Sequence, residues 1–556
     1  MKKTTYIFLA VLFVFFGLQA QDVRKLNIDG DIINLEAGET YKITPNTAGA
    51  SYEILKGSTS QGVFPYSKTI NTFVGLKLNQ ANLSLGFEEP FTLTSTIVPV
   101  QAVTYASSDE SIATVNSSTG LVTGKTAGTA TITATAGEQT ATCEVTVKTL
   151  AQRIADAAGT TATIVVYADE AFSTAIAVNT NNSIITLTTP DDTERILKKT
   201  AIGNLLSVGA NNSVIIEGHV TLKGLATLDY GGTDDLNNTN SLVNVILGGT
   251  LTLKGNAKVT GNAYVVENPS ETNLLGGGIT SRGLLVLDEN AQISNNTVCC
   301  AKPYPTPWSA TSRNGKATWG GGVYLTGSTS VMEIRGNAKI TGNRAINKGG
   351  NSYSGAIFPE AGSTVKMYGG EISGNSAEAS HRAAGGAFHL TSAGKVIMSG
   401  GVIKDNILIY GGAGTGVACL LEGDRLYLSG SASIPAKSGT RDTELTEYTT
   451  ITGIPMYKDD GNTVHVYLNS PCVRVAGTLT GTAPVATFDI TAGASPRVLG
   501  KYDPETFALS NFTTDAPVDK FALGSYLTIT GTFATLQLNP INDKVIKSDG
   551  TIGTPE

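Results

Sequence analysis

One phrase recurs through the middle of the chain and restricts what the chain can fold into. It reads apolar–x–apolar, a glycine-containing turn, x–apolar, then two residues that end in asparagine. Its copies lie roughly 30–50 residues apart, the spacing of solenoid repeats. Such a unit cannot bury its own apolar face, so we expect the units to stack as coils of a right-handed parallel β-helix. The phrase-final asparagines are Asn262, Asn296, Asn343, Asn375 and Asn406.

The repeat also predicts which residues of neighbouring coils meet. Each unit should hold three short strands with glycines at the corners. Stacking in register places Glu333 beside Lys366, and Lys339 beside Glu371, as pairs of opposite charge on the outer surface. The recurring asparagine is expected at a left-handed corner, where its amide bonds the asparagines above and below it.

Composition agrees with a chain of turns and short strands. Of 556 residues, 63 are glycine, 7% are aromatic and 15% are charged. The net charge is −7 and no long basic run exists, so we expect no nucleic-acid partner.

The first 20 residues are typical of a secretory signal peptide. Lys2 and Lys3 precede an apolar run over 6–18, and Ala20 supplies a small residue for cleavage. The run is too short for a membrane span, and no later stretch is apolar enough for one. No cysteine follows Ala20, so we expect an extracellular, cell-surface or periplasmic protein that is not a lipoprotein.

The cysteines point to neither a disulfide framework nor a metal site. The count is odd, which leaves at least one thiol unpaired within a monomer, and Cys299 and Cys300 are too close to bridge without strain. No Cys/His cluster has zinc-ligand spacing, so we expect no metal and no cofactor. The five are Cys143, Cys299, Cys300, Cys419 and Cys472.

A separate β module precedes the repeats. Residues 141–147 alternate apolar and polar side chains, which places Cys143 on the buried face of a strand. The text from Ser107 to Val147, with SSDESIATV, GLVTG and AGTATITA, resembles the bacterial Ig-like group 2 family. Tyr105 departs from that pattern, because the family usually has tryptophan there. The resemblance implies a β-sandwich typical of bacterial surface and secreted proteins, without catalytic residues.

The repeat region has its own resemblance. Its phrases GGGVYL, RGNAKITGN and GGEISGN resemble the pectin-lyase-like β-helix superfamily, and more closely the uncharacterised surface repeat proteins of Bacteroidota. The predicted fold class is therefore all-β, an Ig-like β-sandwich module followed by a right-handed single-stranded parallel β-helix. The expected divisions are a signal peptide (1–20), a small β region (21–75), the Ig-like domain (76–148), the β-helix with an N-terminal capping helix at 150–158 (149–500), and a C-terminal β cap (501–556).

The resemblance makes an enzyme an alternative, because that superfamily includes polysaccharide lyases and hydrolases. Such enzymes need clustered carboxylates or an equivalent base. The acidic pairs at 191–192, 234–235 and 459–460 lie in turn-like text, without a partner motif, and we interpret them as solvated turns. His389 stands at a position equivalent to Leu325, which predicts a core histidine. No catalytic residue is predicted.

The segments after the recurring asparagine are the better functional candidates. They cover 263–275, 297–319, 344–354 and 376–384, and we expect them to form a ridge of loops along one side of the rod. Exposed aromatic rings with nearby donors suit sugar rings, although the two tryptophans would also serve to cover the rod. The candidate ligand contacts are Tyr304, Trp308, Arg313, Lys316, Trp319, Arg344, His381 and Arg382.

The leading hypothesis is a non-enzymatic, adhesin-like binding protein, secreted or on the cell surface. Its loop ridge would contact a polysaccharide or other glycan, or a host surface protein. One alternative is a polysaccharide lyase or glycoside hydrolase of the pectin-lyase-like fold. A second is a structural protein of a surface layer.

Overall fold

The computed structural model describes residues 70–98, 100–225, 238–266, 274–301, 317–360, 362–390, 394–416, 418–421 and 426–435, together with shorter strands outside these ranges whose bounds are given below. The chain divides into two units, 1–150 and 151–556, which are described separately. Within the described ranges, no helix has both the length and the apolar character that a membrane span requires.

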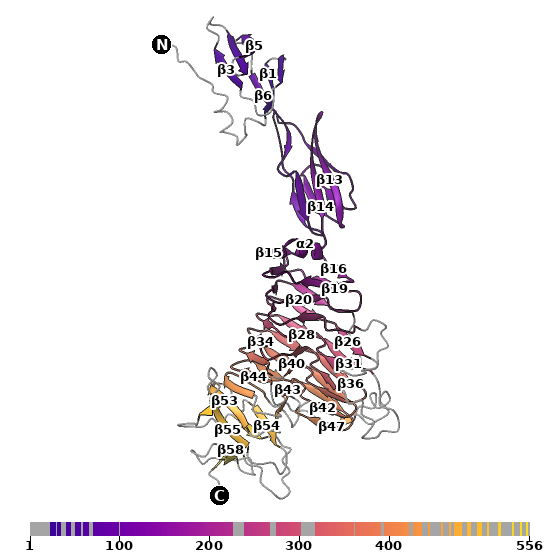
Figure 1. The fold of residues 1–556 in the computed structure, drawn as a ribbon, viewed down its shortest axis with the longest axis vertical. Coiled ribbons are helices and arrows are strands. Elements are labelled where there is room, and N and C mark those ends of the chain that lie inside the picture. The colour runs from indigo at the N-terminus through magenta and orange to yellow at the C-terminus, as the bar shows by residue number, and fades with distance from the viewer. Residues whose placement is uncertain are drawn as a thin grey trace. The chain divides into compact units, whose positions relative to one another are not determined.

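The first unit contains four small sheets (Figure 1). Two of them are β2–β1–β6–β9 and β3–β4–β5, and the sandwich pairs β10–β13–β14–β7 with β11–β12–β8. The bounds are β1 Val23–Ile28, β2 Asp31–Asn34, β3 Tyr41–Pro45, β4 Ser51–Lys56, β5 Thr59–Pro65, β6 Ile70–Leu78, β7 Asn82–Leu85, β8 Pro90–Thr92, β9 Ser95–Val98, β10 Thr104–Ser107, β11 Ala113–Val115, β12 Leu121–Gly124, β13 Gly128–Ala136 and β14 Gln139–Val147.

The sandwich core follows the predicted alternation. Cys143 and Val145 on β14 are fully buried, while their neighbours face outward. Tyr105, which replaces the expected tryptophan, is buried, and its hydroxyl lies 3.0 Å from the Ser95 hydroxyl. Gly120, with a φ of 71°, leaves room for the Tyr105 ring, because a Cβ there would lie 2.9 Å from it.

The second unit is a column of coils built from five parallel sheets, here named S1 to S5 (Figure 1). S1 contains β15 Thr161–Val165, β18 Ile184–Thr188, β21 Ser213–Ile216, β24 Thr250–Leu253, β29 Leu284–Leu287, β34 Val331–Ile334, β39 Thr364–Met367, β44 Lys395–Met398, β49 Leu426–Gly430, β53 Cys472–Leu479, β55 Arg497–Tyr502 and β58 Leu536–Leu538. Three short strands join it antiparallel, β56 Leu509–Ser510, β59 Val545–Ile546 and β60 Ile552–Gly553.

The other two sheets of the column run alongside S1. S2 contains β16 Glu170–Phe172, β19 Arg195–Lys199, β22 Val220–Lys223, β25 Lys258–Thr260, β30 Gln292–Ser294, β35 Lys339–Thr341, β40 Glu371–Ser373 and β45 Val402–Lys404. S3 contains β17 Ile176–Val178, β20 Leu206–Val208, β23 Val243–Val245, β28 Ile279–Ser281, β33 Val323–Leu325, β38 Ile357–Pro359, β43 Phe388–Leu390, β48 Cys419–Leu421, β52 Val466–Leu468, β54 Ala486–Ile490 and β57 Phe521–Leu523.

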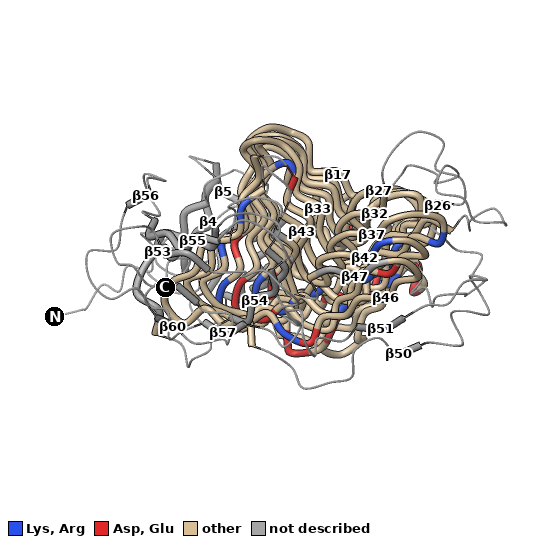
Figure 2. The backbone as a smooth tube through the Cα atoms, turned by 90° about the horizontal axis from the view of Figure 1, so that it is seen from below, with Lys and Arg blue, Asp and Glu red and all other residues tan. Residues whose placement is uncertain are grey.

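Two further sheets form a side extension of the coils, which we call the lateral lobe. S4 contains β26 Ala263–Val266, β31 Thr297–Cys300, β36 Arg344–Asn347, β41 Ser376–Ala379, β46 Ile407–Tyr410, and the antiparallel strands β51 Tyr457–Asp459 and β50 Thr443–Glu444. S5 contains β27 Leu274–Leu275, β32 Ala317–Trp319, β37 Asn351–Tyr353, β42 Arg382–Ala384 and β47 Ala413–Thr415. Figure 2, a view along the column, shows β26, β32 and β37 beside the main coil.

The fold class is confirmed: the chain is almost entirely β, and the Ig-like sandwich is followed by a right-handed parallel β-helix. The predicted helix is present as α2, Leu150–Asp156, and Arg153 donates to the backbone oxygen of Val165 on the first strand of the column at 3.0 Å. The first two coils use S1, S2 and S3 alone, and in the third coil Asn238 already pairs with Tyr264 of S4. The five coils from β24 to β48 visit S1, S2, S4, S5 and S3 in turn.

The expected ridge of loops was wrong for two of its four segments. The segments 344–354 and 376–384 consist mainly of strands, β36 with β37 and β41 with β42, which stack in register with their neighbours. Short strands also occupy parts of 263–275 and 297–319. The prediction failed because strands of three or four residues between glycines resemble loops when they are read one coil at a time.

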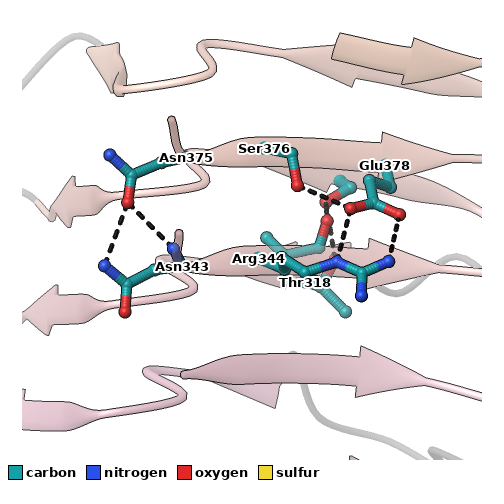
Figure 3. Close-up of polar contacts among 8 residues, drawn as sticks. Thr318, Asn343, Arg344, Asn375, Ser376 and Glu378 are labelled. Atoms are coloured by element: carbon teal, nitrogen blue, oxygen red, sulfur yellow. Dashed lines mark hydrogen bonds and ion pairs between the residues drawn. The ribbon is translucent and has the colours of Figure 1, made fainter. Parts of the chain in front are cut away.

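The recurring asparagines lie in a single file, as predicted (Figure 3). Asn343 donates its side-chain amide to Oδ1 of Asn375 at 2.9 Å and its backbone N–H to the same oxygen at 3.0 Å. The same two bonds join Asn296 to Asn343, each at 3.1 Å, and Asn375 to Asn406, each at 3.0 Å. All these side chains are buried, so every coil depends on the next for its polar partners.

One detail of this corner differs from the prediction. The left-handed backbone belongs to the residue before each ladder asparagine and not to the asparagine itself. Those residues are Gly261, Asn295, Gly342, Gly374 and Asp405, with φ between 53° and 67°. The preceding residue makes the bend, which leaves the asparagine free to point along the column.

The predicted strand register is confirmed, while one ion pair differs. Glu333 lies opposite Lys366, and Lys339 lies opposite Glu371. The Lys366 ammonium is 4.0 Å from Glu333, but the Glu371 carboxylate takes Lys404 of the following coil, at 3.1 Å. A hydrogen bond from Ser373, with Lys404 beside it, lowers the pKa of Glu371.

The second coil carries a charged side chain where later coils have a turn residue. Lys199 is 1% exposed, and its ammonium donates to the backbone oxygen of Ser173 at 2.7 Å. Burial lowers the pKa of Lys199 below its ordinary value of 10.5. Its neighbour Lys198 points out into solvent and provides an internal reference.

The asparagine ladder should carry a large share of the column's stability. Asn343→Ala removes the acceptor for two donors of Asn296 and the donor for Asn375 and Ile293. We expect a loss of about 3 kcal/mol in the free energy of unfolding, because buried groups are left unpaired. Denaturant unfolding measures it, with the exposed Asn337→Ala as the control, expected within about 0.5 kcal/mol of the wild type. Equal effects of the two substitutions would contradict the ladder's role.

Lys199 should make stability depend on pH in a defined direction. The unfolded chain binds the proton of this ammonium more tightly than the folded chain does, so stability rises with pH as the ordinary pKa of 10.5 is approached from below. Relative to Lys199→Met, the wild type should therefore gain stability as the pH rises toward 10.5. Chemical unfolding at several pH values tests this, and Lys198→Met should show no such trend. A flat difference for Lys199→Met would contradict it.

Candidate binding site on the lateral lobe

Four of the eight predicted contact residues lie within the described part of the lobe. These are Trp319 and Arg382 on S5, Arg344 on S4, and His381 in the turn between the two sheets. Tyr304, Trp308, Arg313 and Lys316 lie outside the described residues.

The lobe is two layers thick. Alternate residues of S4 point at S5 and form small apolar cores, one around Val298 and Ala345, another around Ala377 and Leu408. Arg344 occupies the other alternation of S4 and faces away from S5. Trp319 and Arg382 face away from S4. The structure therefore does not bring Arg344 together with the others.

Trp319 packs into an aromatic cluster between S5 and S3. Its ring centroid is 4.6 Å from that of Tyr353 and 4.2 Å from that of Phe358, and it stacks on His389 at 5.9 Å. Its indole Nε1 is buried and meets no acceptor among the described residues. The tryptophan thus folds back against the column, while part of the side chain stays exposed. Sequence reasoning missed Tyr353 and Phe358, because only strand register places them next to Trp319.

The predicted position of His389 was wrong. Phe388, not His389, continues the inward column of Val323 and Ile357. His389 therefore points out of the main coil with Phe358, and it is only 3% exposed because S5 covers it. The equivalence to Leu325 failed by one residue, which reverses the face of a strand.

Arg344 and Glu378 form the strongest electrostatic contact of the lobe (Figure 3). The guanidinium donates through Nε to Oε1 at 2.7 Å and through a terminal nitrogen to Oε2 at 2.9 Å. Ser376 donates to the same carboxylate at 2.5 Å, and the Glu378 side chain is 2% exposed. The geometry is bidentate, which fixes the pair and neutralises an arginine that was predicted to contact a ligand.

Counting from the ladder would have found this pair. Arg344 follows Asn343 directly, Ser376 follows Asn375 directly, and Glu378 stands two residues later on the same face. The pairing can be recognised from the position of each residue relative to the ladder asparagine of its own coil. It cannot be recognised from the separation of Arg344 and Glu378 along the sequence.

The remaining polar residues occupy the side of S5 that bears Trp319. His381 lies 2.7 Å from the side-chain oxygen of Asn351, through Nδ1. Arg382 is partly exposed and shares its strand face with Ala384, which packs in the cluster with Tyr353. This side offers a cation and aromatic edges at the surface, a combination that suits a sugar or a protein side chain better than a chemical step.

The cysteine thiols in the described part of the chain are buried and unreactive. Burial raises the pKa of Cys299 to about 12, so its thiol stays protonated at neutral pH. Cys143, Cys299, Cys300 and Cys419 are all buried free thiols. Within the described ranges, no group of three or more His, Cys, Asp or Glu could hold a metal ion.

Of the acidic pairs weighed as catalytic, only the pair at 191–192 has described side chains. Both are well exposed, at 53% for Asp191 and fully for Asp192. Hydrogen bonds from Thr193 lower the pKa of Asp191, as expected of a carboxylate that organises a turn. The pair at 234–235 and the side chains at 459–460 lie outside the described residues.

One comparison with known proteins falls within the first unit. Residues 76–147 match the bacterial Ig-like domain (group 2). The Ig-like resemblance inferred from the residues is thereby confirmed. The chain is also similar to a protein named Ig-like virion protein from Serratia phage KSP90, with 42% identity over 134 residues. That alignment covers 23% of this chain and 50% of the phage protein, so the chain spans about half the length of this curated relative.

The buried ion pair of the lobe should be far more costly to break than a surface pair. Arg344→Ala leaves the Glu378 carboxylate buried without its cation, and we expect a loss of about 3–5 kcal/mol in the free energy of unfolding. Adding Glu378→Gln should recover part of that loss. A double-mutant cycle of the partly exposed pair, with Lys366→Ala and Glu333→Gln, should show a coupling free energy of at most about 1 kcal/mol. Similar couplings in the two cycles would contradict this view of the lobe.

Proposed function

We propose that this chain is a non-enzymatic binding protein of a secreted or surface-exposed kind, and that the lateral lobe makes the contact. A surface or structural role is supported by the bacterial Ig-like domain at 76–147 and by the virion protein that shares similarity with part of the chain. The signal-like N-terminus is consistent with export.

One observation carries the proposal. The first two coils close with S1, S2 and S3 alone, so a coil of this column does not need the lobe to be complete. The lobe nevertheless continues through consecutive coils, with its own apolar cores and a buried ion pair. Such an addition to a rigid scaffold needs a reason outside folding, and presentation of a contact surface is the usual one.

The proposed contact surface is the side of S5 that bears Trp319 and Arg382, extended by the predicted residues Tyr304, Trp308, Arg313 and Lys316. Aromatic edges and cations support a glycan, whose rings stack and whose hydroxyls accept hydrogen bonds, or a protein surface. The opposite side of the lobe contributes less, since Glu378 already neutralises Arg344.

A glycan array probed with the full chain, with release of soluble sugar products measured in parallel, tests this function. We expect binding without product release, and a loss of at least about tenfold in affinity for Trp308→Ala and Arg382→Ala. Lys198→Ala on S2, an exposed residue of a coil without the lobe, is the matched control and should bind as the wild type does.

Two results would count against the proposal. Release of sugar products would establish an enzyme of the pectin-lyase-like kind instead. Binding that is unchanged in both lobe variants would remove the lobe as the contact surface. Trp319→Ala is not used, because it would also disrupt the cluster with Tyr353 and Phe358.

A further inference from the structure

The outer face of S1 differs from an ordinary exterior over its first five strands. From β15 to β29, the first and third side chains of each strand point outward and stack in register on those of the next coil. None of the ten is charged. They are Thr161, Ile184, Ser213, Thr250 and Leu284 in one column, and Thr163, Thr186, Ile215, Thr252 and Val286 in the other. We call these ten residues the neutral face.

The adjoining sheet shows that this is not a property of the whole column. In the same coils, S2 turns Lys198, Lys223 and Lys258 outward. Lys258 pairs with Glu194 at 2.9 Å, as solvated faces commonly do. Within the S1 strands themselves, the first charged outward residues are Glu333 and Lys366, in the coils that follow. Directly after the strands β21 and β24, Glu217 and Lys254 flank the neutral face and pair with each other at 2.6 Å, so their charges compensate.

The neutral face is accessible and has an apolar rim. Ile184, on the second strand of the face, is 41% exposed, while Val286 on the last strand is 8% exposed. The turn before β24 exposes Ile246 to 38% and Leu247 to 59%. That turn lies against the face, because a Cβ on Gly283, the residue before Leu284, would be 2.9 Å from the Ile246 carbonyl oxygen. Exposed apolar side chains gathered in one place mark contact surfaces.

We propose that the neutral face binds the neutral face of a second copy of this chain. Flat sheets carrying Thr, Ile, Leu and Val pack face to face about 10 Å apart, with interdigitating side chains. An uncharged face meets itself without like-charge repulsion, so a two-fold contact is self-complementary here. Elsewhere two copies with a net charge of −7 repel one another.

The size of the face sets the strength of the contact. The face is five coils tall, at about 4.8 Å per coil, and its two columns with the adjoining turn are about 15 Å wide. Its area is therefore roughly 350 Å² on each copy. Two copies would bury about 700 Å², below the roughly 1,200 Å² of stable complexes. The association is therefore weak, with half of the chains paired only at tens to hundreds of micromolar. High local concentration, as on a crowded surface, would favour it.

Sedimentation velocity of the full chain from about 5 to 500 µM tests the proposal. The average mass should rise from monomer toward dimer with concentration, and 0.5 M NaCl should not reverse it, since apolar contacts are not screened by salt. Ile184→Lys should weaken association by at least about tenfold, because a two-fold contact would bring two lysines together. Ile215→Lys, one coil further on, should act in the same direction.

Thr341→Lys is the matched control. It places the same charge at an outward, partly exposed position on S2 and should associate as the wild type does. Thermal unfolding of each variant verifies that the column is intact, and Ile184 is exposed enough that its replacement should leave folding unchanged.

Several results would overturn the proposal. These are a wild type that stays monomeric throughout, a dimer that salt dissociates, or lysine variants that associate as well as the control. If Ile184→Lys removed glycan binding but left self-association intact, the neutral face would bind a neutral polymer and not a second copy of the chain. Glycan binding by the lobe is measured separately with Trp308→Ala and Arg382→Ala. Failure of the self-association proposal can therefore be distinguished from failure of the proposed lobe function.

Discussion

The narrow neck of each coil is the constraint on which the rest of the second unit depends. There the ladder asparagines lie directly against glycines that lead into S3. The Asn262 amide donates to the Gly277 oxygen at 2.7 Å, and a Cβ on Gly321 or Gly322 would lie 2.4 Å from the Arg344 backbone or 3.0 Å from the Asn343 side chain. A larger residue at the neck would force the two parts of the coil apart. The asparagines in turn need the coil above and below, which makes neighbouring coils interdependent.

The neck also explains why the lobe can exist. A coil that is pinched at one point encloses two small apolar interiors instead of one wide interior, which short strands could not fill. The main interior is lined by inward columns such as Met332, Val365 and Val396, and the lobe by small residues such as Ala377 and Ala383. Both interiors stay packed while the coil gains a second pair of sheets. The buried pair of Arg344 and Glu378 lies on the outer side of this addition, where its bidentate geometry fixes S4 strands to one another.

Function and architecture are connected through this division of the column. S2 turns lysines outward in the early coils, whereas the first five strands of S1 carry no charged side chain on their outer face. The lobe occurs in only part of the column and carries the aromatic and cationic side chains. A rod with two distinct faces at different heights fits a protein that contacts one partner through the lobe and its own copies through S1. The Ig-like module at 76–147 is of a type common in surface and secreted proteins.

The sequence by itself determined the repeat, the asparagine file, the register of Glu333 with Lys366, and the Ig-like module, because each rests on local periodicity that a reader can count along one chain. Four predictions needed more. The left-handed corner falls on Gly342 instead of Asn343, His389 belongs with Phe358, Arg344 is neutralised by Glu378, and two of the four expected loops are mainly strands. Only tertiary structure decided these points, because each depends on which residues of different coils face one another, and a shift of one residue reverses the face of a strand.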